Sequence, residues 1–272
     1  MMKRITILGT VFFFIALLGS SWYFFSAPQA TCFDGKQNQG ERGVDCGGPC
    51  AHSCEVVRTP EALVIRESAF VPGGKEGEYD VMAKIYNPND ELGAAVLPYA
   101  FRLEDGSGNT LAEASGTGFI LPQETKTFLL IGLKASSMPR SVSVTFPEAQ
   151  WEKFSGYQEK PSLSIINKRY APVTSGPFFG RAEGTLVNDS IFDFRSVLVK
   201  VILRDASGKP LAFNQTEMNT VRTRESRDFQ LTWPKAFVGE VAQVDVEPEA
   251  DVYHEENFVR QYVEPGKFQD LR

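Results

Sequence analysis

Four cysteines form a dense group of reactive side chains in this 272-residue chain, and none follows them in the sequence. An even, clustered set is typical of two disulfide bonds in an oxidising compartment. The sequence does not choose among the three possible pairings. A four-thiolate zinc site is the alternative, but the gaps between the last three cysteines are wider than those of zinc knuckles. The residues are Cys32, Cys46, Cys50 and Cys54.

Oxygen-bearing side chains alternate with glycines in the same stretch. Asp, Asn and Glu at short intervals are ligands that suit calcium, so the sequence raises a calcium site. The EF-hand spacing is absent, and the same residue types form turns in which the side chain accepts hydrogen bonds from its own backbone. Both interpretations stay open. The candidate calcium ligands are Asp34, Asn38, Glu41 and Asp45.

Groups that could run a reaction are sparse elsewhere. The two histidines, His52 and His254, lie in different segments, which leaves a Ser-His-Asp or Cys-His arrangement almost no base. The sequence has no HExxH, no Walker loop and no GxGxxG before a helix. The 34 acidic residues single out no carboxylate pair for glycoside hydrolysis. We therefore expect no enzymatic activity, no catalytic residue and no cofactor other than calcium.

Charge is distributed unevenly along the chain. Residues 1–30 carry Lys3 and Arg4 and no acid, which leaves 26 basic and 34 acidic residues and a formal net charge of −8 for the remainder. Nucleic acid needs a basic face, so this acidic bulk argues against a nucleic-acid partner. It equally disfavours direct binding to anionic lipid headgroups.

An uninterrupted apolar run extends from Ile5 to Phe25. Its 21 residues match a hydrocarbon core of about 30 Å at the rise of an α-helix. Trp22 and Tyr23 lie near its outer end, where aromatic rings favour the membrane interface, and the basic residues before it favour a cytoplasmic N-terminus. A cleaved signal peptide is the alternative, but the run continues past the small residues ending at Ser21. We expect a single-pass cell-membrane protein with an extracytoplasmic C-terminus.

The chain after the cysteines contains an internal repeat with a period of about one hundred residues. Residues 105–112 recur as 205–212, and residues 147–149 recur as 248–250. Further matches keep the order and an offset of 100 or 101. They are Tyr86-Asn87 with Val187-Asn188, and residues 124–128 with 225–229.

Both copies alternate apolar and polar residues with a period of two, which predicts strands. Asp-Gly-Ser-Gly in one copy and Asp-Ala-Ser-Gly in the other are typical of hairpin turns. About seven short strands in a hundred residues indicate a two-sheet sandwich. We expect an all-β fold of two tandem sandwiches after the transmembrane helix and the disulfide-rich linker. The apolar stripes include Val81, Ala83 and Ile85, then Tyr99, Phe101 and Leu103, and in the second copy Val197, Val199, Val201 and Leu203.

The string Phe101-Arg-Leu103-Glu-Asp105, followed by a Gly-Ser-Gly turn, is similar to the FxLYD domain of bacterial and archaeal envelope proteins. The second copy has Val201-Ile-Leu203-Arg-Asp205 at the same place, and both copies have an Asn at the end of the preceding strand. Glu104 and Arg204 replace the tyrosine of the family motif. The resemblance covers most of residues 60–255. It implies an immunoglobulin-like fold and no activity.

The cysteine-rich segment resembles the CxDGxxNxxExGxDCGGxCxxC-type motif of secreted bacterial surface proteins. It departs from that motif at Gln39-Gly40 and in the spacing before Cys54. The resemblance implies a stalk or spacer beside other extracellular domains. The matching residues are Cys32, Asp34, Gly35, Asn38, Glu41, Gly43, Asp45, Cys46, Gly47, Gly48 and Cys50.

Aromatic residues gather in two further places. Trp151, Phe154 and Tyr157 lie in the expected linker between the sandwiches, before Pro161, where they either hold the two sandwiches together or contact a carbohydrate or a protein. The C-terminal tail is either a final strand or a docking peptide. Its aromatic residues are Tyr253, Phe258, Tyr262 and Phe268; two glycosylation sequons begin at Asn188 and Asn214.

The sequence therefore predicts five parts and a binding role. An unknown envelope protein or polymer is the expected partner, besides the membrane. The alternatives are an accessory or assembly factor of a secretion, pilus or respiratory complex, whose sheet edges accept client strands, and an envelope hydrolase. The parts are residues 1–30 (cytoplasmic tip and signal anchor), 31–57 (Cys-rich knot), 58–158 and 159–255 (the two sandwiches), and 256–272 (C-terminal tail).

Overall fold

The computed structural model describes residues 32–50, 59–154 and 161–260, with four residues of the N-terminal run, Phe13, Ile15, Leu17 and Leu18. Within these residues, no helix has both the length and the apolar character needed to cross a bilayer. The chain divides into two compact units, residues 1–59 and 60–272. The predicted domain boundary between residues 158 and 159 lies outside the described residues.

Residues 32–50 of the first unit form a series of turns and bends without a strand or helix. One antiparallel bridge joins Gly43 to Cys46. This segment has many glycines and few aliphatic side chains, so covalent links rather than an apolar core must order it.

The described part of the second unit is built from strands, which confirms the all-β prediction. Its first half contains β1 (Val64–Pro72), β2 (Glu78–Tyr86), β3 (Leu92–Glu104), β4 (Thr110–Ile120), β5 (Thr125–Lys134), β6 (Ser141–Thr145) and β7 (Gln150–Lys153). Its second half contains β8 (Leu163–Pro172), β9 (Gly180–Asn188), β10 (Phe194–Arg204), β11 (Pro210–Val221), β12 (Ser226–Trp233) and β13 (Gln243–Ala250), then the short turns η1 (Val252–His254) and α2 (Glu256–Phe258).

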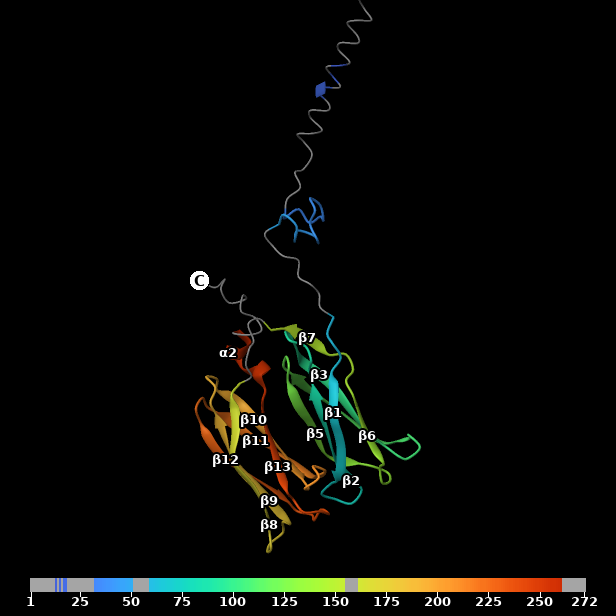
Figure 1. Cartoon of the computed structure of the whole chain (residues 1–272), viewed down its shortest axis with the longest axis vertical. Helices are drawn as coiled ribbons and strands as arrows, with labels where there is room; N and C mark the ends of the chain where they lie inside the picture. The colour runs from blue at the N-terminus through green and yellow to red at the C-terminus, as the bar shows by residue number, and fades with distance from the viewer. Residues whose placement is uncertain are drawn as a thin grey trace, which may run out of the picture. The chain divides into compact units, whose positions relative to one another are not determined.

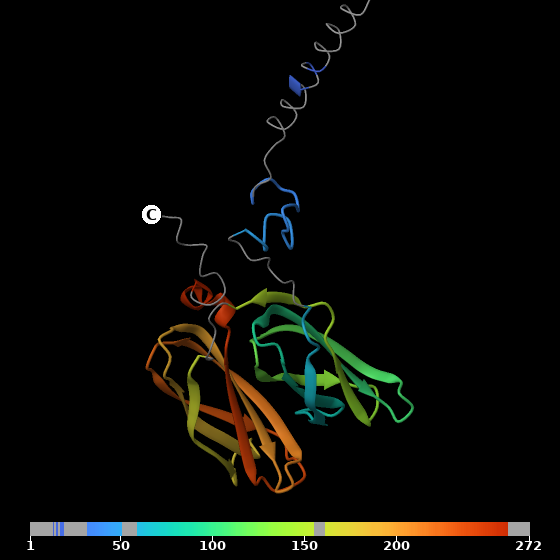
Figure 2. The same ribbon diagram turned by 45° about the horizontal axis from the view of Figure 1, so that its top comes forward.

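The two halves repeat one sheet topology. In the first half, sheet 1 has the order β1-β2-β5, and sheet 2 has the order β4-β3-β6 with β7 also paired to β3. In the second half, sheet 3 has the order β8-β9-β12, and sheet 4 has the order β11-β10-β13. All the pairings between these strands are antiparallel. Each half is therefore a β-sandwich, and the internal repeat is visible in the fold (Figures 1 and 2).

The predicted apolar stripes form the cores of both sandwiches. Phe101 and Leu103 are fully buried between sheets 1 and 2, as the two-residue alternation predicts. Val201 and Leu203 occupy the same places between sheets 3 and 4. No cysteine lies in this part of the sequence, so apolar burial and hydrogen bonds hold the sheets together.

The repeated Asp-x-Ser-Gly strings form the predicted hairpin turns. The carboxylate of Asp105 accepts hydrogen bonds from the backbone N–H groups of Ser107 and Asn109 at 2.7 and 2.9 Å. Gly108 closes the turn at φ +83°, a conformation that favours glycine. Asp205 and Gly208 form the same turn in the second half.

The repeated asparagines have one structural role. The side-chain amide of Asn87 donates to the carbonyl oxygens of Leu92 and Leu121, both at 2.8 Å. Asn188 bridges the corresponding loops of the second half, and both asparagines are fully buried. Each amide satisfies loop carbonyls that would otherwise be buried without a donor.

The two sandwiches pack face to face through sheet 1 and sheet 4. A separate apolar cluster joins residues from the outward faces of these two sheets. The layers therefore follow the order sheet 2, sheet 1, sheet 4, sheet 3, and the halves lie side by side in both views (Figures 1 and 2). The buried members of this cluster, which we name the joint, are Val71, Met82, Leu129, Ile202 and Phe213.

The chain enters this four-layer body at one end. β1, the first strand of the second compact unit, starts at the end that also carries η1 and α2 (Figure 1). Six connections lie at the opposite end, which we name the loop end. They are residues 73–77, 105–109, 135–140, 173–179, 205–209 and 234–242.

Candidate functional site

The cysteine cluster is oxidised. Cys32 and Cys50 form a disulfide, and Cys46 is also disulfide-bonded. Cys54 lies outside the described residues. The sulfurs of Cys32 and Cys50 are not thiolates, so the alternative of a four-thiolate zinc site is wrong.

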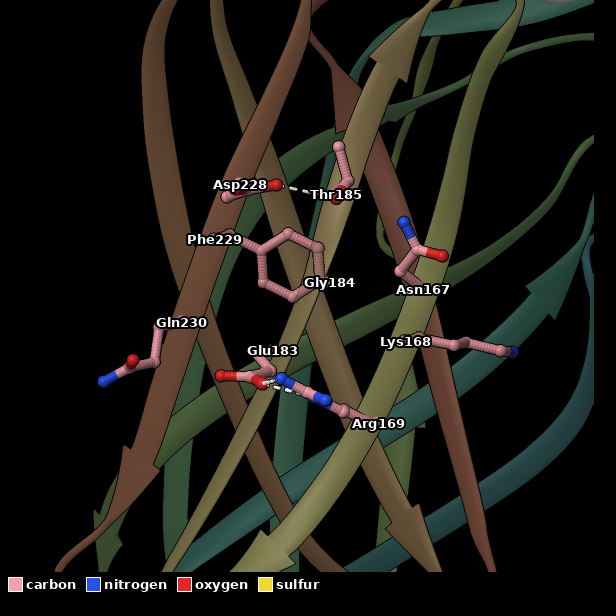
Figure 3. Close-up of a pocket in the computed structure, with 9 residues that line it drawn as sticks. All are labelled: Asn167, Lys168, Arg169, Glu183, Gly184, Thr185, Asp228, Phe229 and Gln230. Carbon is pink, nitrogen blue, oxygen red and sulfur yellow. Dashed lines mark hydrogen bonds and ion pairs between the residues drawn. The ribbon is translucent and has the colours of Figure 1, made fainter.

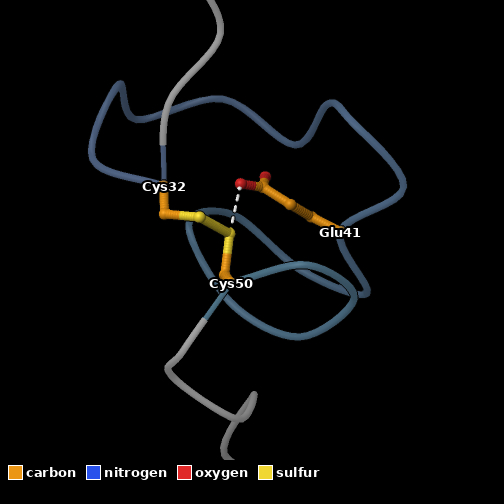
Figure 4. A group of neighbouring side chains, drawn as sticks. All are labelled: Cys32, Glu41 and Cys50. Atoms are coloured by element: carbon orange, nitrogen blue, oxygen red, sulfur yellow. Dashed lines mark hydrogen bonds between the residues drawn. A yellow bond between two sulfur atoms is a disulfide. The ribbon is translucent and has the colours of Figure 1, made fainter.

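The carboxylate of Glu41 lies against this disulfide (Figure 4). Its Oε1 atom is 3.0 Å from Sγ of Cys50, which carries no hydrogen in a disulfide, and Oε2 accepts the backbone N–H of Asn38 at 3.1 Å. Glu41 is only 7% exposed. Cys32, Glu41 and Cys50 are the one group of potential ligands that converges among the described residues. Two of the three are consumed by the disulfide, so this group does not form a metal site.

The other predicted calcium ligands are engaged in turns. Asp45 accepts backbone N–H groups of Asp34 and Gly35, at 2.9 Å and at 3.0 and 3.2 Å. Asp34 accepts the N–H of Lys36 and the side-chain amide of Asn38, both at 2.9 Å. These are the side-chain-to-backbone bonds of the turn interpretation. Calcium binding by Asp34, Asn38, Glu41 and Asp45 stays a prediction.

A broad groove lies on the outward face of sheet 3 (Figure 3). Its volume is about 830 Å³, and polar side chains of β8, β9 and β12 line it. Arg169 pairs with Glu183 across the groove, and Thr185 donates to Asp228 at 2.7 Å. The backbone of β8 bulges between Ile166 and Arg169, which widens this edge of the sheet. The groove offers donors and acceptors to a polar ligand, but Arg169 and Glu183 already pair with each other.

The strongest electrostatic perturbations lie beside the joint. The ammonium groups of Lys126 and Lys200 both reach the carboxylate of Glu249, Lys126 at 3.5 Å. Lys126 also donates to the carbonyl of Phe119 at 2.9 Å and lies over its ring, and Lys200 donates to the carbonyl of Thr127 in the other half. Both lysine side chains are at most 4% exposed.

These contacts move two pKa values. Burial lowers the pKa of Lys126, against the opposing effect of the nearby carboxylates of Glu249 and Glu124. Burial alone would raise the pKa of Glu249, but its attraction to Lys126 and Lys200 outweighs this and lowers it. A cavity of about 150 Å³ lies beside Lys126 and Glu249, but the charged groups of the cluster are already bonded to one another and to backbone carbonyls. The cluster links the halves and shows no reactive geometry.

Arg204 makes a second ionic link across the joint. Its guanidinium pairs with both oxygens of Glu67 in the first half at 2.7 and 2.9 Å, and with Asp245 at 2.6 Å. It also donates to the carbonyl of Gly208 at 2.9 Å. Hydrogen bonds to the two carboxylates raise its pKa further, against the effect of burial. A bidentate pair of this kind fixes orientation as well as contributing energy.

Two of the three aromatic residues predicted near the domain boundary are described by the structure, one in a strand and one in a buried cluster. Trp151 lies in β7, paired with Ala94 of β3, so its prediction as a linker residue is wrong. Phe154 is 2% exposed in a core cluster, so it is not available as a surface contact. Tyr157 lies outside the described residues. Phe154 packs against Tyr253 and Phe258 of the second half, at ring centroid distances of 5.8 and 6.4 Å, as expected of a residue that holds the two sandwiches together.

One aromatic residue of the predicted C-terminal tail is buried in the second half. Phe258 belongs to the predicted tail, which was expected to form a final strand or a docking peptide, but it is fully buried in α2 beside Phe192 and Phe154. Tyr262 and Phe268 lie outside the described residues.

The two sequons have little access to a glycosyl donor. Asn188 is fully buried and its amide donates to two carbonyls. Asn214 donates its amide to the carbonyl of Thr232 at 2.9 Å. His52 and the side chain of His254 lie outside the described residues.

Lys126, Lys200, Arg204 and Glu249 were not singled out by sequence reasoning. One signal could have found Arg204. It stands where the first copy has Glu104, and where the resembling family has tyrosine, so a departure from both patterns marked a residue with a role of its own.

Comparisons with known proteins do not assign this chain to a family. No protein-family profile and no curated protein matches it. Among solved structures, one match is the crystal structure of the calcium-binding domain CBD12 of CALX1.1. It is 11% identical, the alignment covers 68% of this chain and 80% of that chain, and the TM-score is 0.18. A likeness at this TM-score carries no argument about fold, calcium or function.

Proposed function

We propose that this chain is a single-pass, membrane-anchored extracytoplasmic protein whose two immunoglobulin-like sandwiches bind a protein or polymer at the cell envelope. The segment from Ile5 to Phe25 is its anchor, with Lys3 and Arg4 on the cytoplasmic side. The Cys-rich segment is a stiff spacer. The protein recognises a partner and catalyses no reaction.

Two observations support the anchor and the compartment. Phe13, Ile15, Leu17 and Leu18 have helical backbone and side chains that are 48 to 70% exposed, as suits contact with lipid. The Cys32–Cys50 disulfide suits an oxidising compartment outside the cytoplasm.

The observation that carries the binding proposal is the position of the loops. β1, the first strand of the four-layer body, starts at one end, and six connections from both halves gather at the opposite end. The joint holds both sets of loops in one body, which lowers the entropic cost of binding. Loops placed by a rigid sandwich are a common site of recognition.

A second candidate is an assembly factor that accepts client strands on a sheet edge. The edge strand β8 favours it, because among the described strands β8 pairs with β9 alone and Ile166 is 47% exposed. Its bulge between Ile166 and Arg169 counts against it, since a bulge interrupts the regular edge that strand addition requires.

Protease protection and cross-linking test the proposal. The full chain, tagged at both ends, is expressed in cells that are converted to spheroplasts. We expect an external protease to remove the C-terminal tag and spare the N-terminal tag. An impermeant amine-reactive cross-linker should then join the chain to an envelope component.

A fusion of residues 1–58 to an unrelated globular domain is the matched control, because it keeps the anchor and the knot and lacks the sandwiches. The cross-linked species should be absent from this control. The opposite protection pattern would overturn the topology, and equal cross-linking of the control would overturn the binding role of the sandwiches.

A further inference from the structure

A small cleft lies at the loop end, where the two halves meet. Its volume is about 180 Å³, close to that of the apolar cavities of about 150 Å³ that hold a benzene ring. Both halves line it, so it exists only because the sandwiches are joined. The residues used below are Gly73, Asp80 and Ile131 of the first half, and Phe213, Trp233 and Phe237 of the second.

The cleft contains a carboxylate with spare acceptor capacity. Asp80 is 6% exposed, and its Oδ1 accepts the backbone N–H of Gly132 at 2.8 Å. Among the described residues, no cation lies within ion-pair distance of this carboxylate and no donor reaches Oδ2. A Cβ atom at Gly73 would lie 3.1 Å from Oδ1, so the glycine leaves room beside the acid.

The surrounding charges leave Asp80 without compensation. The pKa of Asp80 is raised to about 6, chiefly by burial and further by the neighbouring carboxylate of Glu78, while the hydrogen bond from the Gly132 N–H acts in the opposite direction. Lys75 lies 4.0 Å from Glu78, and Lys235 of the second half lines the cleft but makes no ion pair with Asp80. Because its pKa of about 6 lies below neutral pH, Asp80 is mainly ionised at pH 7. A buried carboxylate without a counter-ion raises the free energy of the folded state.

The rest of the lining is apolar. Ile131 is 42% exposed at the mouth, while Phe213 and Trp233 are 2% and 6% exposed. The indole N–H of Trp233 already donates to the carbonyl of Phe213 at 3.1 Å. The walls can therefore pack a hydrocarbon stem but offer it no hydrogen bond from the indole.

We propose that this cleft receives the side chain of one arginine from a protein partner. The guanidinium bonds the carboxylate of Asp80, and the three methylene groups pack against Ile131 and the aromatic wall. Arginine fits better than lysine because its planar head forms two bonds to a carboxylate and stacks on aromatic rings. The acidic balance of the chain after residue 30 favours a basic partner surface. This inference rests on the proposed function and names its partner chemistry.

The test uses the full chain in a mild detergent and the probe N-acetyl-arginine amide. The amide signal of Gly132 reports binding, because this N–H bonds Asp80 directly. We expect saturable shifts of Gly132 with the arginine probe. The neutral isostere N-acetyl-citrulline amide should bind at least about tenfold more weakly, as expected when a charged hydrogen bond is lost.

Two variants separate the cleft from other acidic surface. Asp80→Asn keeps the shape and should lower the affinity at least about tenfold, and Ile131→Ser, at an exposed position, should lower it about threefold or more. Arg169→Glu in the sheet 3 groove is the control and should leave the affinity unchanged. Equal affinity for the citrulline probe, or for both cleft variants, would overturn the proposal. Because the assay needs no membrane and no native partner, its failure is distinct from failure of the topology experiment.

Discussion

The same strand positions face opposite environments in the two halves of the repeat. In β10 and β11, Ile202 and Phe213 form a cross-strand pair buried in the joint. Their equivalents in β3 and β4 are Arg102 and Glu113, which form an ion pair with both side chains 46% exposed. The same position of the fold therefore carries an apolar pair where the other half covers the sheet, and a charged pair where the sheet faces water.

Sheets 1 and 3 show the opposite pattern: here the first half carries the buried apolar pair and the second half carries the polar pair. In the first half, Met82 of β2 pairs with Leu129 of β5, and both are buried in the joint. Their equivalents in the second half are Glu183 and Gln230, which line the open groove of sheet 3. The two halves are therefore not interchangeable, because each copy has one outward face with apolar residues that pack against the other copy.

The largest expected effect comes from a charge placed in the joint. Ile202→Asp buries a carboxylate among apolar side chains, so we expect it to lower the free energy of unfolding by about 4 kcal/mol or to separate the halves. Urea unfolding of the full chain measures it. The matched control is Arg102→Asp at the equivalent exposed position, where the change should stay within about 1 kcal/mol. Equal losses in the two variants would remove the contrast between the faces.

A smaller effect is expected when volume is removed. Met82→Ala leaves a cavity at a fully buried position and should cost about 2–4 kcal/mol. Glu183→Ala, at the equivalent position, should cost less than about 1 kcal/mol, because its ion pairs with Arg169 and Arg181 are partly exposed. Thermal unfolding of both variants provides the comparison, and similar melting temperatures would contradict it.

The ionic link through Arg204 sharpens the comparison further. Arg204→Ala leaves Glu67 and Asp245 without their cation, so we expect a loss of about 2–3 kcal/mol, less than for a fully buried pair because both acids are about 30% exposed. A double-mutant cycle with Glu67→Ala should give a coupling energy of about 1–2 kcal/mol across the joint. A coupling energy of zero would mean that this pair does not link the halves.

The smallest effect depends on pH. The raised pKa of Asp80 means that the folded chain binds a proton more readily than the unfolded chain between pH 3.8 and about 6. The contribution of Asp80 to stability therefore falls as the pH rises through this window. Asp80→Asn should stabilise the chain by about 1–2 kcal/mol at pH 7.5 and by almost nothing at pH 4. A benefit that does not change with pH would contradict an ionised, buried Asp80.

Much of each sandwich could be predicted from the sequence. The alternation around Phe101 and Leu103 identified core strands, and the chemistry of Asp105 and Gly108 identified a hairpin, because both signals are local. The repeat then transferred these assignments to the second half. The joint was not predicted, because burial of an outward face depends on a neighbour far away in sequence.

The candidate sites were less accessible to sequence reasoning for the same reason. Trp151 was expected in a linker and lies in a strand of the first sandwich, because its pairing with β3 depends on residues far away in the sequence. In the sequence, Asp80 alternates with the apolar stripe of Val81, Ala83 and Ile85, and nothing in this pattern distinguishes it from a solvent-facing acid. Comparison of the copies position by position would have helped, since Met82 opposite Glu183 and Ile202 opposite Arg102 already mark the two faces that meet.

The most direct test of the joint is a methyl NOE spectrum of the full chain labelled at Ile, Leu, Val and Met methyl groups. Packing of sheet 1 against sheet 4 predicts cross-peaks that link Ile202 of the second half to at least one of Val71, Met82 and Leu129 of the first. If Ile202 shows cross-peaks only to residues of its own half, the two sandwiches do not share a buried face and the account of one joined body is wrong.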